Sequence, residues 1–359
     1  MAICFPLRRN RRAFTLVEML TVIIIIGILA SLMLVAFGAA RTRARVMTIK
    51  TEISQLDTAL ENYRQQYGEY PPDFSGVDYP NVAADTPNDR IRTESRQRVL
   101  RHLRKRFPRY QLAGTVDVQW IAFATAVWNA TRTAPYPAFP SADPNGNPNV
   151  PGRGVYVTEF DPRAAVIFWL GGLPAFFGST ELTGVSANVA APFTAGGTRV
   201  PRLFEFSVDR LGYALPSFAQ LAVPPYNAHS VPVYGSFSVN LFANATYPSG
   251  TRTTATPYVY FRAPATGYYF PTSGTYVRYD VRPYYDTRTA RWVEPERFQI
   301  ISAGLDGGFG AISTVAPPAY QDGAYYPAGE NFAADSGGGL HTDNITNFTV
   351  NGAIRDDMP

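Results

Sequence analysis

The sequence is poor in the residues that form disulfides, metal clusters and common catalytic centres. Among 359 residues it has one cysteine, Cys4, and three scattered histidines, His102, His229 and His341. A single cysteine excludes an intramolecular disulfide, and no GxSxG, HExxH or P-loop pattern occurs. Nothing in the sequence therefore indicates an enzyme. The fold must depend on its hydrophobic core or on a bound metal.

Charge is also scarce, and residues 19–40 carry none. At about 1.5 Å per residue, a helix over these 22 residues is about 33 Å long, which is enough to cross a hydrocarbon core. Basic residues flank the segment on both sides: Arg8, Arg9, Arg11 and Arg12 before it, and Arg41, Arg43, Arg45 and Lys50 after it. The charges alone therefore do not decide the orientation in a membrane.

Glu18 stands at the start of this apolar run, and a carboxylate in such a segment costs roughly 2.5 to 3.5 kcal/mol at mid-membrane. A positively charged partner would remove that cost. If the chain is cut between Ala13 and Phe14, the new α-amino group of Phe14 on a neighbouring subunit can be that partner.

The segment RRNRRAFTLVE, residues 8–18, resembles the signal of type IV pilins and type II secretion pseudopilins. The resemblance implies that a prepilin peptidase removes residues 1–13, cutting after Ala13, and N-methylates Phe14. It also implies that Glu18 pairs with a neighbour's amino terminus during assembly. Ala13 departs from the usual glycine before the cut, although its side chain is also small.

Two other interpretations of this segment remain open. The small residues of AFGAA, residues 36–40, offer a cleavage site for an ordinary secretory signal peptide. A plain membrane anchor is the second alternative. The apolar run is longer than the 7 to 15 residues of a typical signal-peptide core, which favours the pilin-like signal.

Removal of residues 1–13 would leave a neutral chain. The leader holds four of the 32 basic residues and no acidic residue, so the remainder has 28 basic and 28 acidic side chains. The net charge of +4 of the full chain therefore says little about binding partners.

Apolar residues at alternating spacings of three and four predict that the helix continues beyond the membrane segment. We expect one helix over residues 14–67, with residues 14–40 in the membrane, ending at Gly68 before two prolines. The stripe consists of Val46, Ile49, Ile53, Leu56, Leu60, Tyr63 and Tyr67. The phrase ALENYRQQYGEYPPD, residues 59–73, resembles the end of the helix in G-type pseudopilins, with Tyr67 and Tyr70 packing on the head.

Residues 68–359 predict a β-rich head, so the expected fold class is α+β with a pilin-like arrangement. Strand-like runs lie at residues 154–157, 236–242, 275–281 and 298–302, and helical patterns lie at 90–107 and 118–129. The head is much larger than that of a typical major pseudopilin.

Residues 90–109 contain nine lysines or arginines and one acidic residue, and their apolar positions fall on one helical face. Nucleic acid and anionic lipid are two possible partners for such a basic helix. We expect instead a solvated helix that balances acidic surface, with nucleic acid an improbable partner.

The stretch FQIISAGLDGGFGAIS, residues 298–313, resembles the calcium-binding loop of the G-type head, and ADSGGGLHTDNITNF, residues 334–348, resembles its closing acidic segment. The resemblance makes Asp306, Asp343 and Asp335 the candidate Ca²⁺ ligands. These two segments are further apart than is usual in the family. The alternative is that Asp306 belongs to a hairpin turn and that Asp343 caps a short turn.

Together these features predict a structural subunit of a type II secretion pseudopilus or a related pilus-like filament. The expected partners are prepilin peptidase, other pilin-like subunits and an inner-membrane assembly platform. The expected location is the bacterial inner membrane, with a cytoplasmic leader and a periplasmic head. The alternatives are a type IV pilin for adhesion, motility or DNA uptake, and a membrane-tethered binding head that does not polymerise.

Overall fold

The computed structural model describes part of the chain in two compact units, Met1–Met47 and Thr48–Pro359. The described residues are 15–77, 87–131, 160, 162–175, 181–194, 196–208, 211–214, 231–234, 257–262, 281–286, 289, 291–305, 309, 324–326, 341–350 and 352–354. Ala13 and Phe14, the residues on either side of the expected cut, lie outside them.

Helix α1 spans Leu16–Tyr67 and has no proline to interrupt it. Gly68 ends the helix in a left-handed conformation, with φ of 77°, and its N–H donates to the carbonyl of Arg64. Such a terminus favours glycine, which has no Cβ to clash. The residues before Thr48 belong to the first unit, and the residues from Thr48 to Tyr67 belong to the second.

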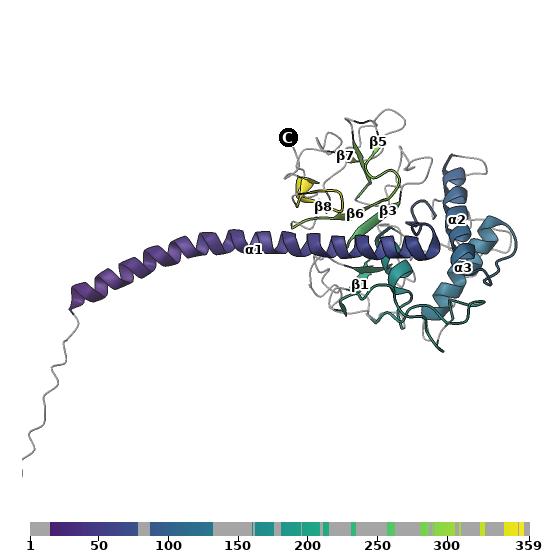
Figure 1. Ribbon diagram of the computed structural model, residues 1–359, viewed down its shortest axis with the longest axis horizontal. Helices are drawn as coiled ribbons and strands as arrows, with labels where there is room; N and C mark the ends of the chain where they lie inside the picture. The colour runs from purple at the N-terminus through teal and green to yellow at the C-terminus, as the bar shows by residue number, and fades with distance from the viewer. Residues whose placement is uncertain are drawn as a thin grey trace, which may run out of the picture. The chain divides into compact units, whose positions relative to one another are not determined.

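In the second unit, α1 lies along a three-stranded antiparallel sheet in the order β3 (Val259–Arg262), β6 (Phe298–Ser302) and β8 (Ile345–Thr346) (Figure 1). The predicted stripe is confirmed where it meets the head, because five of its residues are almost completely buried: Ile49, Ile53, Leu56, Leu60 and Tyr63. Strand β6 is fully buried and confirms the strand predicted at residues 298–302.

The other described strands are short. Strands β1 (Leu211–Ala214) and β2 (Val231–Tyr234) form an antiparallel pair. Strand β4 (Tyr284–Asp286) pairs antiparallel with β5 (Arg291–Trp292) and parallel with β7 (Ala324–Tyr326). The strands predicted at 154–157 and 236–242 lie outside the described residues, as does 275–281 except for Val281, which is not in a strand.

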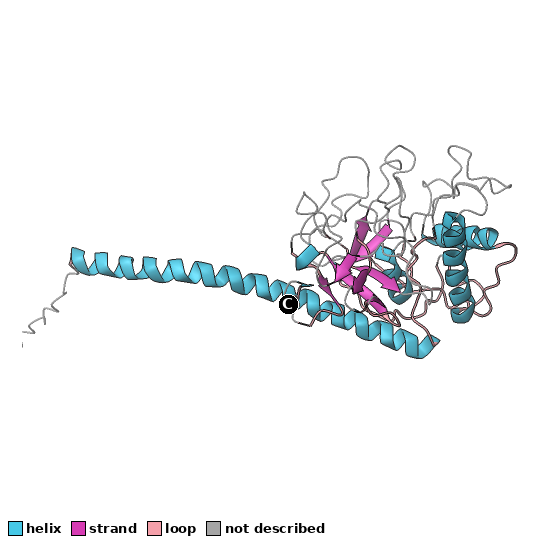
Figure 2. Cartoon of the chain, turned by 90° about the horizontal axis from the view of Figure 1, so that it is seen from above, coloured by secondary structure: helices cyan, strands magenta, loops and turns pink. Residues whose placement is uncertain are grey.

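Helices form the other side of the head (Figure 2). Helix α2 covers Pro87–Arg106 and packs on α3, Val116–Thr131. Helix α4, Pro162–Val166, continues into the π-helix η1, Ile167–Gly171, whose residues are all buried. Aromatic side chains fill the space between these helices, with ring centroids about 5 to 6 Å apart: Trp120, Phe123, Phe160, Phe168, Trp169 and Phe193.

The segment after α1 joins the sheet to the helices. The carbonyl of Pro71 accepts a hydrogen bond from the Tyr260 hydroxyl on β3 (2.8 Å), and that of Pro72 accepts one from Trp169 Nε1 (2.8 Å). The next residue, Asp73, accepts the backbone N–H of Arg262 at 3.0 Å. Prolines cannot donate backbone hydrogen bonds, but their carbonyls accept them, and here both carbonyls are used.

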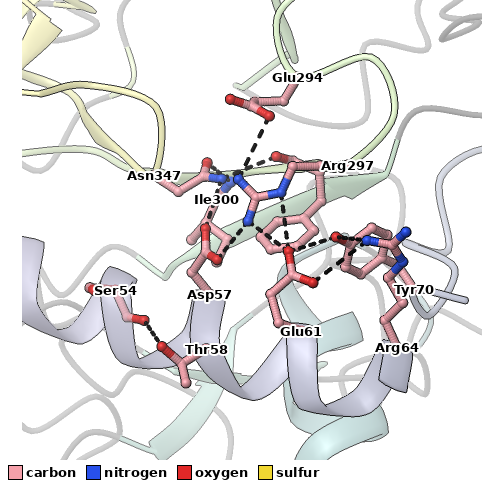
Figure 3. A network of polar contacts seen from close by, with 11 residues as sticks. Ser54, Asp57, Thr58, Glu61, Arg64, Tyr70, Glu294, Arg297, Ile300 and Asn347 are labelled. Atoms are coloured by element: carbon pink, nitrogen blue, oxygen red, sulfur yellow. Dashed lines mark hydrogen bonds and ion pairs between the residues drawn. The ribbon is translucent and has the colours of Figure 1, made fainter. Parts of the chain in front are cut away.

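A polar network fastens the outer face of α1 to the turn before β6 (Figure 3). Arg297 Nη2 lies 2.8 Å from both Asp57 Oδ1 and Glu61 Oε1, and the Tyr70 hydroxyl also donates to Glu61 Oε1 at 2.7 Å. Asn347 Oδ1 accepts the Ile300 N–H at 2.9 Å, which holds the end of β8 on β6. One guanidinium thus neutralises two carboxylates that lie one helical turn apart.

Replacing this guanidinium should destabilise the head. We expect Arg297→Ala to lower the free energy of unfolding by about 1–2 kcal/mol, because it removes charged hydrogen bonds and leaves two half-buried carboxylates facing each other. Thermal unfolding of the full chain in detergent would measure the change.

Arg64→Ala is the matched control. Arg64 is more exposed and lies 3.8 Å from Glu61 Oε2, so its loss should cost less than about 0.5 kcal/mol. Equal losses in the two variants would contradict the central role of Arg297.

Candidate functional site

The amino terminus of α1 is closed by a reciprocal cap between Thr15 and Glu18. Glu18 Oε2 accepts the Thr15 N–H at 2.8 Å and the Thr15 hydroxyl at 2.9 Å, while the Glu18 N–H donates to Thr15 Oγ1 at 3.2 Å. This is a capping box, with threonine at the N-cap and glutamate three residues later. Glu18 Oε1 makes no hydrogen bond to any described residue.

Behind this cap, α1 exposes a long, mainly apolar surface up to Met33. Residues 16–33 form a helix long and apolar enough to cross a membrane, and none of that window is buried within the chain. Side chains on every face are exposed, for example Leu16 at 82%, Ile25 at 56% and Leu32 at 65%. A helix that is apolar all round requires lipid or other helices around it.

The candidate metal ligands are only partly described. Asp343, in the short helix η5 (His341–Asp343), is buried, and its Oδ2 accepts the Leu305 N–H at 2.9 Å. A Cβ on Gly304 would lie 2.1 Å from the Asp343 carbonyl oxygen, so glycine is required for this approach. Asp306 and Asp335 lie outside the described residues.

The structure therefore brings the two calcium-like segments into contact, although about 40 residues of sequence separate them. Asn344 adds a second link, because its Nδ2 donates to the Phe309 carbonyl at 3.1 Å. Within the described part of the chain no three acidic, histidine or cysteine side chains gather as a metal site. Of the expected ligands, Asp343 alone is placed, and it lies against the glycine-rich turn.

Helix α2 turns several of its basic residues inward. Arg96 is buried, donates to Asp117 Oδ1 and to the Val77 carbonyl (both 2.7 Å), and lies over the Trp120 ring. Arg106 lies over the rings of Tyr63, Tyr67, Phe107 and Trp169. These residues connect α2 to α1 and α3, so this side of α2 is buried and not solvated as predicted, and Arg96 forms its ion pair with Asp117 inside the head.

A buried polar array connects the ends of α1 and α2, and the sequence interpretation did not anticipate it. The Tyr63 hydroxyl lies 2.6 Å from His102 Nε2, and His102 Nδ1 lies 2.7 Å from Glu69 Oε1. The only signal in the sequence is that His102 falls beside Leu103 and three residues after Val99, on the apolar face of α2.

The charge states in this array follow from burial at His102 and from a hydrogen bond at Glu69. Burial lowers the pKa of His102, although Glu69 opposes the effect, so the imidazole is neutral at pH 7. Its hydrogen bond to Glu69 lowers the pKa of that carboxyl to about 2. A neutral His102 with its proton on Nδ1 can donate a hydrogen bond to Glu69 and accept one from the Tyr63 hydroxyl. The array is a structural link between two helices, since water has little access to it.

Comparison with known proteins finds a match to the amino-terminal region. Residues 8–34 match the prokaryotic N-terminal methylation motif. This motif includes Ala13, Phe14, the Thr15–Glu18 cap and the apolar helix that follows. The recognised pilin-like signal is therefore present in the chain.

The amino-terminal region is also similar to type II secretion system core protein G. Identity is 34% over 70 residues to the protein of Klebsiella michiganensis, 32% over 71 residues to that of Pseudomonas aeruginosa, and 34% over 71 residues to that of Aeromonas hydrophila. The aligned segment is 20% of this chain and 49% to 50% of each relative. The chain thus spans about half the length of the curated relatives it matches, because only that part of each relative aligns. The full chain is more than twice as long as each of them. No solved structure matches the chain.

The buried histidine predicts a specific loss of stability in mild acid. The unfolded state binds a proton near pH 6.5, but the folded state does so only at lower pH, so stability falls as pH drops below about 6.5. A further loss should follow below pH 4.5 as Glu69 approaches its folded pKa of about 2. Melting temperatures of the full chain in detergent, measured from pH 7.5 to 5.5, would show the first step.

His102→Gln should lower the melting temperature at pH 7.5 and flatten its dependence between pH 7.5 and 5.5. His229→Gln and His341→Gln are the controls and should keep the slope of the unmodified protein. An unchanged slope in His102→Gln would show that another group causes the acid sensitivity.

Proposed function

We propose that the chain is a structural subunit of a type II secretion pseudopilus or a related type IV pilus-like filament. The observation that carries the proposal is the coincidence of three features in residues 8–34: the methylation motif, a carboxylate at the start of α1, and a helix that is apolar on every face. A mechanical role, and not catalysis, follows from this combination. The similarity to core protein G supports the secretion pseudopilus over the other filaments.

In this proposal the apolar half of α1 waits in the inner membrane, with the leader in the cytoplasm and the head in the periplasm. Prepilin peptidase cuts after Ala13 and methylates Phe14. Assembly through the inner-membrane platform then moves the helix from lipid into a bundle of neighbouring helices. Both surroundings satisfy its apolar surface, so the transfer requires no exposure to water.

Pairing of Glu18 with a neighbour favours the filament over the membrane-embedded state. In the isolated chain, Oε2 accepts both hydrogen bonds from Thr15, while Oε1 has no described partner. The amino group of a neighbour's Phe14 can therefore pair with Oε1 without breaking the cap. Because the pair forms in a medium of low dielectric, it contributes far more than an exposed ion pair does.

The decisive experiment separates the charge of Glu18 from its capping role. Glutamine also forms a capping box, so Glu18→Gln keeps the helix terminus and removes only the charge. We expect Glu18→Gln and Glu18→Val to insert into membranes as the unmodified protein does but to be depleted in filaments by tenfold or more. Quantitative mass spectrometry of sheared filaments would measure incorporation.

Thr15→Ala is the matched control, because it removes the cap, at a cost of about 0.5–2 kcal/mol, but keeps the carboxylate. It should assemble better than Glu18→Gln. The same spectra should show N-methyl-Phe14 as the first residue. A first residue at Ala40 or Arg41, or normal incorporation of both Glu18 variants, would contradict the proposal.

We also propose that the head binds Ca²⁺ beside the glycine-rich turn, with Asp306 and Asp343 as ligands and Asp335 as a further candidate. The support is the contact between Asp343 and the Gly304–Leu305 backbone, which places one carboxylate next to the segment that contains Asp306. Ca²⁺ prefers six to eight oxygen ligands, and a glycine-rich turn can supply backbone carbonyls. The ion would tie the two segments together where the chain has no disulfide.

Calcium should therefore stabilise the folded head. A ligand at a hundred times its dissociation constant stabilises by about 2.7 kcal/mol, so melting should shift upward in calcium relative to chelator. Asp306→Ala should abolish most of the shift. Asp343→Asn, which keeps an acceptor for the Leu305 N–H, should reduce it. Glu296→Gln, at an exposed position, is the control. Identical melting of the unmodified protein in calcium and chelator would leave Asp306 and Asp343 as turn residues.

A further inference from the structure

Three arginines follow the apolar run of α1, and all three are exposed: Arg41, Arg43 and Arg45. No acidic residue lies within four positions of any of them, and Glu18 is the sole acidic residue in the sequence of the first unit. The i, i+3 and i, i+4 ion pairs that normally neutralise arginine on a helix are therefore impossible here. Any anion that these exposed guanidinium groups contact therefore comes from outside this stretch of the helix.

Helical geometry distributes these arginines around the helix axis. Successive residues turn by about 100°, so Arg41 and Arg45 lie about 40° apart, and Arg43 lies on nearly the opposite face. The uncharged residues 19–40 place them about 33 Å along the axis from Glu18. This distance matches the hydrocarbon thickness of a bilayer, so the arginines form a collar at the level of the headgroups.

The chemistry of the collar favours phosphate. Guanidinium binds phosphate oxygens in a bidentate manner, and long basic side chains at a helix end extend into the interfacial region. A single acidic protein would contact only one face of the helix, whereas headgroups surround it. Positions on opposite faces therefore favour lipid over a protein partner.

We propose that Arg41, Arg43 and Arg45 bind the phosphates of anionic phospholipid headgroups while α1 lies in the membrane. The inference rests on the proposed function, because it requires residues 19–40 to span the bilayer. The collar fixes the depth of the helix and holds the subunit in the membrane until assembly. Extraction into a filament must break these contacts, so the arginines oppose the pairing of Glu18.

The test is the selectivity of the full chain for anionic lipid. The protein is reconstituted in phosphatidylcholine vesicles containing spin-labelled phosphatidylglycerol or spin-labelled phosphatidylcholine, and electron spin resonance gives the fraction of motionally restricted lipid. A basic residue near a membrane surface contributes about 1 kcal/mol, or about fivefold in affinity. R41Q/R43Q/R45Q should lower the relative association of phosphatidylglycerol at least fivefold, and R41K/R43K/R45K should largely retain it. The four leader arginines are the same in every protein compared.

The control is R90Q/R101Q/R109Q, which removes three exposed arginines from α2 and the turn after it. It should keep the preference for phosphatidylglycerol, and salt should weaken that preference in the unmodified protein. Equal selectivity in the glutamine variant and the unmodified protein overturns the inference. The inference is also overturned if R41Q/R43Q/R45Q retains lipid selectivity but assembles poorly into filaments, because that result identifies an acidic protein partner.

Resistance to extraction by alkaline carbonate separates this inference from the proposed function. An unmodified protein that resists extraction but shows no preference for phosphatidylglycerol overturns the collar alone. Release of the unmodified protein by carbonate overturns the membrane span, and with it both proposals.

Discussion

The need to cover one long apolar helix constrains everything else in this chain. Over residues 19–40, α1 is uncharged on every face, and water is not an acceptable surrounding for it. From Ile49 onward the same helix is apolar on one face only, and that face is buried in the head. The first part of α1 can therefore be surrounded by any apolar medium, whereas the part from Ile49 onward packs on one partner, the head.

The head stabilises its part of α1 without any disulfide. Burial of Ile53, Leu56 and Leu60 supplies apolar contact on one side, and Arg297 holds Asp57 and Glu61 on another. At the end of the helix, the prolines that stop it also present two carbonyls to the sheet and to η1. Termination and attachment therefore depend on the same few residues. This short segment therefore orients both the sheet and η1 on α1.

Sequence reasoning succeeded where one local rule dominates. The three-and-four spacing from Ile49 to Tyr63 identified the buried face of α1, and the β-branched run around Ile300 identified β6. It did not find the network around Arg297, because Arg297 meets Asp57 across 240 positions in the sequence. The Tyr63–His102–Glu69 array was missed for the same reason. The Thr15–Glu18 cap was not predicted either, although a threonine followed three residues later by glutamate is the sequence signature of a capping box.

The contact between the glycine-rich turn and the closing segment also fixes two points of the chain that lie far apart in the sequence. Asp343 is tied to Leu305, and Asn344 is tied to Phe309, so the chain leaves and re-enters the core at one fixed point. The closure entropy of an intervening loop rises by only about 0.6 kcal/mol for each doubling of its length. Strand β6 ends before the first tie and β8 begins after the second, so the length of the chain between the ties does not alter the pairing of β6 with β8. The two ties therefore fix this end of the β6–β8 pair at little entropic cost, whatever the length of the chain that joins them.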